Sequence, residues 1–586
     1  MANSTIMRTL RTRALFGSAS VLAALSASPV MAQADPVAPP ISAPVAGQAV
    51  AGQADPTATP ALAQDVSSAQ PARRITIRPY VEASQTLAAD LNGGDVLTYT
   101  SLAAGVDAAV ATQRVSGQLS YRYEHRFGWG DRLGDDDIHS GLARVDARIT
   151  PNLTLEGAGI ATRSRSDIRG SAPGILVGNV SNVSQIYSVY AGPSFTSTAG
   201  PVALNANYRL GYTKVDTPTF GDAGLGGQRL DYYDDSVGNT VTASASVRPG
   251  AIAPFGLTVS GAYDRETASQ LKQRYEGYYG RGDILQPISP YVAVTAGVGY
   301  EKIETSQKDA VVDATGTPVL DRDGRFITNE ASPRRVAYRT DGIYYDAGVV
   351  WRPNRRTSVE AHVGRRYGSL SYTGTATYQA SESVGMAVNV YDGVQTFGRQ
   401  LRTGIGNLPT SFLTGNQQGF GQQFNGCVFG SSGAQPGGCL NDVFQSISTA
   451  SYRARGIDGV ISATRGRSTW GAGIGYANRK LYAPRLAPGL VVAGLDDESY
   501  YGQLFYTRQL TPVSGVNADL FVNYYDSGVA DITGDSGVWS YGGTGTYYHN
   551  FGRLGTTASL GLYSFKVGDL DSDWSAQALI GARYQF

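Results

Sequence analysis

The feature that most constrains this chain is an alternation of apolar and polar side chains with a period of two. Between Val115 and Phe127 the odd positions are mostly apolar or aromatic and the even positions are polar or charged, and segments 202–213 and 343–352 repeat the pattern. Such alternation is typical of strands with one apolar and one polar face. Each segment is about ten residues long, as a tilted strand crossing a bilayer requires. The pattern therefore predicts membrane-spanning strands.

A helical membrane protein is excluded. Beyond residue 32 the chain has no apolar run of about 18 residues, the minimum for a spanning helix. A sheet in hydrocarbon must close on itself, because every backbone donor and acceptor there needs a partner. We therefore expect an all-β fold, a transmembrane antiparallel β-barrel of roughly 16 to 22 strands.

Connections between the alternating segments are of two kinds. The short ones lie at 112–114, 150–152, 352–356, 381–383, 465–467, 511–514 and 550–554. The long ones, which are polar and often acidic, lie at 128–137, 304–335 and 393–443. This asymmetry predicts short periplasmic turns on one rim and long extracellular loops on the other.

The N-terminal residues predict export. Three arginines precede an apolar stretch and a small-residue site that ends at Ala32, which is the pattern of a cleaved signal peptide, 1–32. Residues 33–72 are rich in Ala, Pro and Gln and predict a disordered periplasmic leader, so that the outer-membrane barrel comprises 73–586. The 48 Lys and Arg lose three with the signal, which leaves 45 against 48 Asp and Glu. This mildly acidic balance gives no sign of a nucleic-acid partner.

The final 13 residues predict the strand that closes the barrel. Trp574, Ile580, Tyr584 and Phe586 share one face of this strand, and only Leu579 interrupts the polar face opposite. Here the sequence resembles outer-membrane proteins that end in such a strand with a terminal Phe. In that class the barrel-assembly machinery recognises the strand. The resemblance therefore implies that the four residues form an assembly signal and that the protein lies in the cell outer membrane.

Two cysteines, Cys427 and Cys439, lie 12 positions apart in a Gly-rich stretch. Because a signal peptide sends the chain to an oxidising compartment, we expect a local disulfide. Closing so short a loop contributes roughly 3 kcal/mol, mostly to the order of the loop.

Many charges fall on the predicted inward faces of the strands. They are Arg122, Glu124, Arg126, Arg144, Asp146, Arg148, Glu156, Glu360, His362 and Arg366. One interpretation is a ladder of ion pairs that stiffens the lumen wall. The other is a constriction that selects permeating solutes by charge, and the same residues can serve both.

The remaining polar residues do not indicate catalysis or a bound cofactor. Four histidines, His125, His139, His362 and His549, show no metal-ligand spacing, and no specific Ser-His or Asp-His pairing at one rim can be assembled from them. Acidic loops such as 135–137 lack the full calcium-loop pattern and are better explained as solvated loops, with weak divalent bridging to lipopolysaccharide as a secondary effect. We therefore expect no enzyme, no metal site and no cofactor.

A wider resemblance rests on the Ala/Pro-rich leader, RRYG at 365–368, VYDGVQTFGRQL at 390–401 and the CVFG…GGCL cysteine loop. With these features the chain resembles a family of large outer-membrane barrels from sphingomonad-type α-proteobacteria, sometimes catalogued as preprotein translocase subunits. That small translocase component resembles a single membrane helix with a soluble tail, and no such helix follows the signal peptide here. The resemblance therefore implies a location and no particular activity.

Three functions remain open from the sequence. The leading hypothesis is a porin-like channel for passive or polysaccharide-associated solute passage, because the inner face is polar and the leader is too short to be the globular plug of a TonB-dependent transporter. The contrasting hypothesis is a surface or adhesion scaffold with a blocked lumen, whose disulfide-ordered loop binds a partner. The third is an outer-membrane enzyme, whose activity a substitution of His362 should impair if that residue takes part.

The expected partners are outer-membrane lipids, lipopolysaccharide and the barrel-assembly machinery. The strand faces show no apolar excess that would mark a subunit contact, so the sequence predicts no particular oligomeric state.

Overall fold

The structure is a computed structural model, and it describes most of the region expected to form the barrel. The described residues are 74–129, 135–166, 183–217, 232–414, 424–445, 447–484, 496–526 and 537–586. The expected signal peptide and leader lie outside these residues.

Twenty-two strands form one antiparallel sheet in which each strand pairs with its neighbours along the chain. They are β1 (Arg74–Asp90), β2 (Val96–Ala111), β3 (Val115–Trp129), β4 (Asp136–Thr150), β5 (Leu153–Arg165), β6 (Val183–Ala199), β7 (Val202–Asp216), β8 (Asp235–Val247), β9 (Gly256–Ala268), β10 (Arg274–Pro287), β11 (Val292–Gln307), β12 (Arg335–Asn354), β13 (Thr357–Arg366), β14 (Ser369–Ser381), β15 (Val384–Gln395), β18 (Ser451–Arg465), β19 (Ser468–Tyr482), β20 (Asp496–Thr511), β21 (Ser514–Asp526), β22 (Gly537–Phe551), β23 (Leu554–Val567) and β24 (Asp573–Gln585). The expectation of an all-β antiparallel barrel is confirmed, with a strand number at the top of the expected range.

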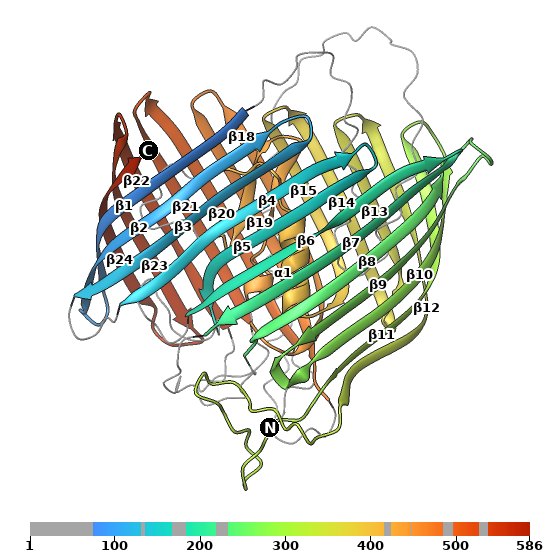
Figure 1. Cartoon of the computed structure of the whole chain (residues 1–586), viewed down its shortest axis with the longest axis horizontal. Coiled ribbons are helices and arrows are strands. Elements are labelled where there is room, and N and C mark those ends of the chain that lie inside the picture. The colour runs from blue at the N-terminus through green and yellow to red at the C-terminus, as the bar shows by residue number, and fades with distance from the viewer. Residues whose placement is uncertain are drawn as a thin grey trace, which may run out of the picture. The chain divides into compact units, whose positions relative to one another are not determined.

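Pairing between the first and last strands closes the barrel (Figure 1). β1 and β24 lie antiparallel, in register from Tyr80 opposite Gln585 to Asp90 opposite Ser575. Each strand supplies the hydrogen-bond partners that the other would lack at a free edge. The sheet is therefore closed, as spanning a bilayer requires.

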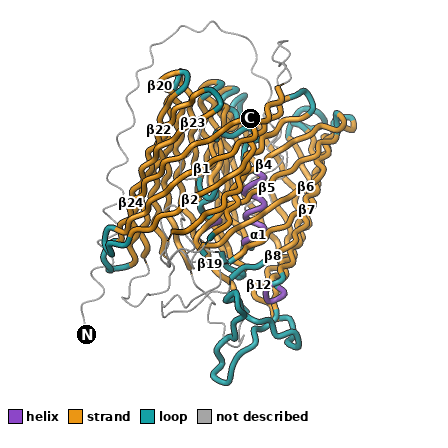
Figure 2. The backbone as a smooth tube through the Cα atoms, turned by 60° about the vertical axis from the view of Figure 1, so that its left-hand side comes forward, coloured by secondary structure: helices purple, strands orange, loops and turns teal. Residues whose placement is uncertain are grey.

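The two rims of the barrel differ. On one rim, which we call the short-turn rim, β1 begins, β24 ends, and the other strands are joined in pairs by short connections such as 151–152 and 466–467. On the opposite, long-loop rim, the connection 308–334 between β11 and β12 extends beyond the strand ends (Figure 2). Short turns and long connections thus lie on opposite rims, as the sequence predicted.

Outward-facing side chains form an apolar surface. Ile343, Ile474 and Ile580 are 74%, 68% and 73% exposed. On β3, Leu119 is also exposed, while Arg122 in the alternate register is buried on the inward face. An apolar surface of this extent is unfavourable in water and suits contact with lipid. The fold is therefore that of an outer-membrane barrel.

The exposed charges are distributed unequally between the rims. The exposed arginines within four residues of a short turn, or of the start of β1, are Arg78, Arg114, Arg148, Arg248, Arg355, Arg356, Arg465, Arg467, Arg508 and Arg553, which we call the rim arginines. Exposed carboxylates gather at the long-loop rim and include Asp90, Asp135, Asp313, Asp496 and Asp571.

One long connection does not extend into solvent. The described residues of the connection 396–450 between β15 and β18, which we call the lumen segment, fold into the barrel. Helix α1 (Phe397–Gly406) of this segment lies inside the ring of strands against β5 to β8 (Figures 1 and 2). Next come a hairpin of β16 (Cys427–Ser432) and β17 (Gln435–Cys439) and the short 3-10 helix η3 (Val443–Gln445). A second such helix, η2 (Gln270–Lys272), joins β9 to β10.

The terminal strand allows a test of the assembly signal. Phe586 is 63% exposed on the outward face, and its backbone N–H donates to the Pro79 carbonyl at 3.1 Å. We predict that Phe586→Ala, which keeps this hydrogen bond, lowers the amount of folded barrel in the outer membrane several-fold, because recognition of the strand is lost. Heat-modifiable mobility of the membrane fraction on gels measures this.

The matched control is Gln585→Ala on the inward side of the same strand, which should assemble normally. Equal assembly of both variants and the wild type would contradict an assembly role for Phe586.

Candidate functional site: the lumen and its inserted segment

The helix of the lumen segment is specified locally. The side chain of Thr396 accepts from the backbone N–H of Arg399 and so caps the helix N-terminus. Phe397, Leu401 and Ile405 recur at every fourth position and therefore share one face. All three are fully buried.

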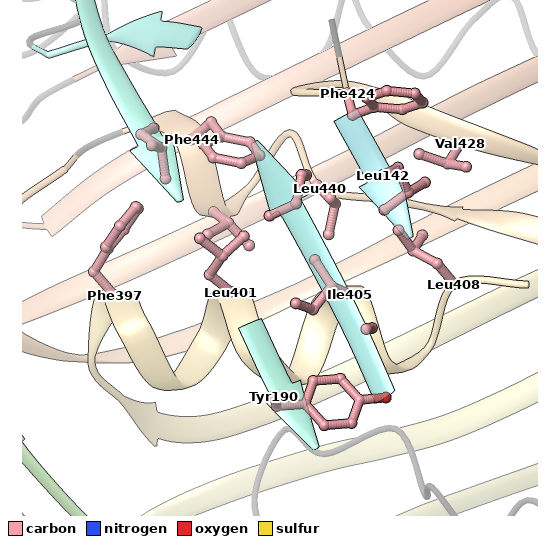
Figure 3. Packing of buried hydrophobic residues seen from close by; sticks show 14 of the residues in the cluster. Leu142, Tyr190, Phe397, Leu401, Ile405, Leu408, Phe424, Val428, Leu440 and Phe444 are labelled. Atoms are coloured by element: carbon pink, nitrogen blue, oxygen red, sulfur yellow. The ribbon is translucent and has the colours of Figure 1, made fainter. Parts of the chain in front are cut away.

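This apolar face packs on the inner wall of the barrel. The same cluster includes Leu142 of β4, Ile160 of β5 and Ile186 of β6, and from the lumen segment Leu440 and Phe444 (Figure 3). Inward positions of these three strands are thus apolar where the wall meets the helix, and the helix has a hydrophobic core of its own inside the barrel.

Two arginines fix the other side of the helix to β9. Arg399 forms an ion pair with Asp264, and both side chains are 3% exposed. Arg402 pairs with Glu266, which also accepts from the Thr396 hydroxyl at 2.7 Å. We call these two ion pairs the arginine latch. Because the charges are removed from water, each depends on its partner for compensation.

Glycines in the wall make room for the latch. The Arg402 side chain lies directly over Gly211 of β7 and Gly238 of β8, where an added Cβ would overlap it. The sequence therefore provides both the space and the charge that the helix requires.

The hairpin of the lumen segment is held on the opposite wall. Cys427 and Cys439 form the expected disulfide, which rests against Gly473 of β19. The Cys427 N–H donates to Gln503 Oε1 of β20 at 2.7 Å. The Ser462 hydroxyl of β18 donates to the Gly430 carbonyl at 2.8 Å. The disulfide is thus part of the lumen and not of a surface loop.

The tip of the hairpin reaches the far rim. Gly433 donates its N–H to the Glu382 carbonyl at 2.8 Å, and Glu382 lies in the short turn between β14 and β15. Since the lumen segment leaves β15 at the long-loop rim, it extends through the full height of the barrel. The sequence pattern groups 393–443 with the long polar loops and leaves open whether the cysteine loop lies inside or outside the barrel. The structure places its described residues inside.

A buried carboxylate joins the two halves of the segment. Asp442 accepts from the Tyr391 hydroxyl at 2.9 Å and from Gln400 Nε2 of α1 at 2.7 Å. Burial raises the pKa of the Asp442 carboxyl above its ordinary value. Gln400 also accepts from the Tyr452 hydroxyl, so this network connects the helix to β18.

The first group of predicted lumen charges lies on β3 to β5, facing inward. Arg122 bonds to Glu124 and to Glu82 of β1, and Arg126 bonds to Glu124 at 2.8 Å. Arg144 pairs with Asp146 of its own strand, and Glu156 pairs with Arg209 of β7 at 2.8 Å. Arg148 is exposed near the short-turn rim.

The second group lies on β13. His362 Nε2 is 2.9 Å from Glu360 and Nδ1 is 3.1 Å from Asp346, whose carboxylate also pairs with Arg281. Arg366 bonds to Glu301 of β11 at 2.8 Å. In both groups the ion pairs run within one strand or between nearby strands, which is the geometry of a ladder along the wall and not of opposed rows.

The latch residues were not singled out from the sequence. Asp264 and Glu266 lie 135 and 136 positions from their arginine partners, so no local pattern joins them. The helix itself left a readable signal, because Phe397, Leu401 and Ile405 have helical spacing within a segment that otherwise resembles a loop.

Among the described residues, no helix is long and apolar enough to cross a membrane. Within the same residues, no group of three or more His, Cys, Asp or Glu side chains is placed to hold a metal ion.

No protein-family model matches the chain, and no curated protein matches it. Among solved structures, the ferric-catecholate import receptor Fiu from E. coli K12 in its open form is 11% identical, with 86% of this chain and 81% of that chain covered and a TM-score of 0.42. The FrpB iron transporter from Neisseria meningitidis (F5-1 variant) is 10% identical over 87% and 82%, with a TM-score of 0.38. The siderophore receptor PirA from Acinetobacter baumannii is 10% identical over 88% and 81%, with a TM-score of 0.37.

Likeness at this level carries no conclusion about activity. The class is defined by the geometry itself, which is that of an outer-membrane β-barrel with one of its own connections inserted in the lumen.

The arginine latch predicts that substitutions of Arg399 and Asp264 have non-additive effects on the stability of α1. Arg399→Ala leaves Asp264 buried without compensation and should lower the free energy of opening of the α1 amides by about 3–5 kcal/mol, read by hydrogen exchange. Asp264→Asn in the same chain should restore much of that loss, because the uncompensated charge is gone. Thr403→Ala on the same helix is the control and should change the opening free energy little. Additive effects of the two latch substitutions would contradict the pairing.

Proposed function

We propose that the protein is an outer-membrane solute channel that the lumen segment closes in the state described here. The observation that carries the proposal is the course of that segment, from the long-loop rim to its contact with Glu382 at the short-turn rim. A connection that fills the height of a lumen and is held there by specific side chains controls whatever passes through.

The connectivity of the lumen segment favours a gate over a permanent plug. Both of its ends leave the barrel at the long-loop rim, from β15 and β18, and these two strands pair with each other from Val384 to Gln395. The segment can therefore move out of the lumen without breaking any pairing of the barrel wall. Its latch consists of ion pairs, which other charged groups can compete for.

The wall behind the segment is suited to polar solutes. Arg122, Glu124, Arg144 and Glu360 face inward within the ladder of ion pairs. Once the segment moves, these groups would line a hydrated passage and contribute to its ion selectivity.

A blocked surface scaffold is the second candidate. The apolar packing of α1 against the wall favours it. So does a contact between side chains of the wall itself, because the Arg165 guanidinium of β5 lies 4.4 Å from the centre of the Phe565 ring of β23. Because the disulfide lies inside the barrel, a partner of such a scaffold would bind other connections, such as 308–334.

Single-channel recording in planar bilayers tests the gate. We predict that the refolded wild type is closed for most of the time and that Arg399→Ala with Arg402→Ala opens it at least several-fold more often. Replacement of residues 397–450 by a short linker should give a large, constantly open conductance, because it removes the connection that extends through the height of the lumen.

Thr403→Ala is the matched control and should behave as the wild type. A folded latch variant and a folded deletion that are both silent would overturn the channel and support the scaffold. A wild type as conductive as the deletion would show that the lumen segment is not the gate.

A further inference from the structure

The rim arginines form a surface that the channel does not use. Among the described residues within four positions of a short turn or of the start of β1, Glu382 is the only exposed carboxylate, and none is a lysine. All six lysines of the chain lie in the half of the barrel nearer the long-loop rim, or in its loops. Although the net charge of the chain is near zero, the short-turn rim of the barrel is therefore strongly cationic.

Three rim arginines gather on neighbouring strands. Ser468 of β19 lies opposite Arg465 of β18 on one side and opposite Arg508 of β20 on the other. Arg467 occupies the turn between β18 and β19, and its carbonyl accepts from the Gln509 N–H at 2.9 Å. All three arginines are exposed, and no ion pair of theirs is found among the described residues. We call them the arginine cluster.

The arginine cluster lies at the edge of the lipid-facing surface. Arg508 follows Leu504 and Tyr506 on the outward face, where Leu504 is 42% exposed. Trp470 and Leu510 are exposed beside it. A guanidinium placed between apolar outward side chains and the rim sits where lipid headgroups meet the hydrocarbon, and not at the mouth of the lumen.

We propose that the arginine cluster binds the phosphate headgroups of anionic glycerophospholipids in the periplasmic leaflet. A guanidinium presents two parallel N–H donors that match a phosphate, and no carboxylate of the described residues forms an ion pair with these three arginines. The net negative charge of a headgroup such as phosphatidylglycerol adds an attraction that phosphatidylcholine lacks. The cluster thereby fixes the height of the barrel in the bilayer and enriches anionic lipid around it.

Quenching of tryptophan fluorescence by brominated lipids tests the proposal in a barrel that keeps Trp470, which lies beside the cluster, and carries Phe at the four other tryptophans. This barrel serves as the wild-type background. The full mature barrel is refolded into phosphatidylcholine vesicles that contain brominated phosphatidylglycerol or brominated phosphatidylcholine. The measured quantity is the association constant for phosphatidylglycerol divided by that for phosphatidylcholine. We predict a ratio of several-fold for the wild type and a ratio near one for the triple variant Arg465→Gln, Arg467→Gln, Arg508→Gln. Salt should weaken the wild-type preference.

The matched control is Lys214→Gln, Lys302→Gln, Lys566→Gln, which removes the same charge near the opposite rim and should keep the preference. Heat-modifiable mobility shows that each variant is folded. An equal preference for phosphatidylglycerol in the wild type and the arginine variant would overturn the proposal. It would favour an acidic protein as the partner of the rim. A preference that inorganic phosphate abolishes at matched ionic strength would also overturn it, because the cluster would then be a site for free anions.

Discussion

The requirement that every backbone N–H and C=O in hydrocarbon has a partner determines the rest of this structure. The pairing of β1 with β24 meets that requirement by closing the sheet. A closed ring of 22 strands encloses a wide lumen, and a wide lumen must be filled, lined or left open to water. In this barrel the ladder of ion pairs lines the lumen, and the inserted connection fills it.

The inserted connection behaves as a small domain that uses the barrel as its second layer. Helix α1 buries Phe397, Leu401 and Ile405 against the wall, while the arginine latch and the disulfide hairpin fix it at two separated places. The apolar contact provides most of the driving force, and the ion pairs determine where the helix sits. Opening of the proposed channel therefore depends on the strength of these contacts.

The sequence predicted what local patterns encode. Period-two alternation assigned Leu119 to the outward face and Arg122 to the inward face, because the side chains of a strand alternate whatever its neighbours are. The inward course of the lumen segment depends on contacts with strands more than a hundred residues away, such as that of Arg399 with Asp264. The arginine rim was also hidden, because turns far apart in the chain meet only once the barrel closes.

Photo-crosslinking in living cells tests the insertion itself most directly. A benzophenone amino acid in place of Phe412, which is 3% exposed and whose N–H donates to Gln118 Oε1 of β3, should crosslink within the chain to peptides of the wall strands β3 to β5. The same group in place of Phe551, which is 63% exposed on the outward face, should crosslink to lipid. Crosslinks from position 412 to lipopolysaccharide or to other proteins would contradict a connection that lies inside the barrel.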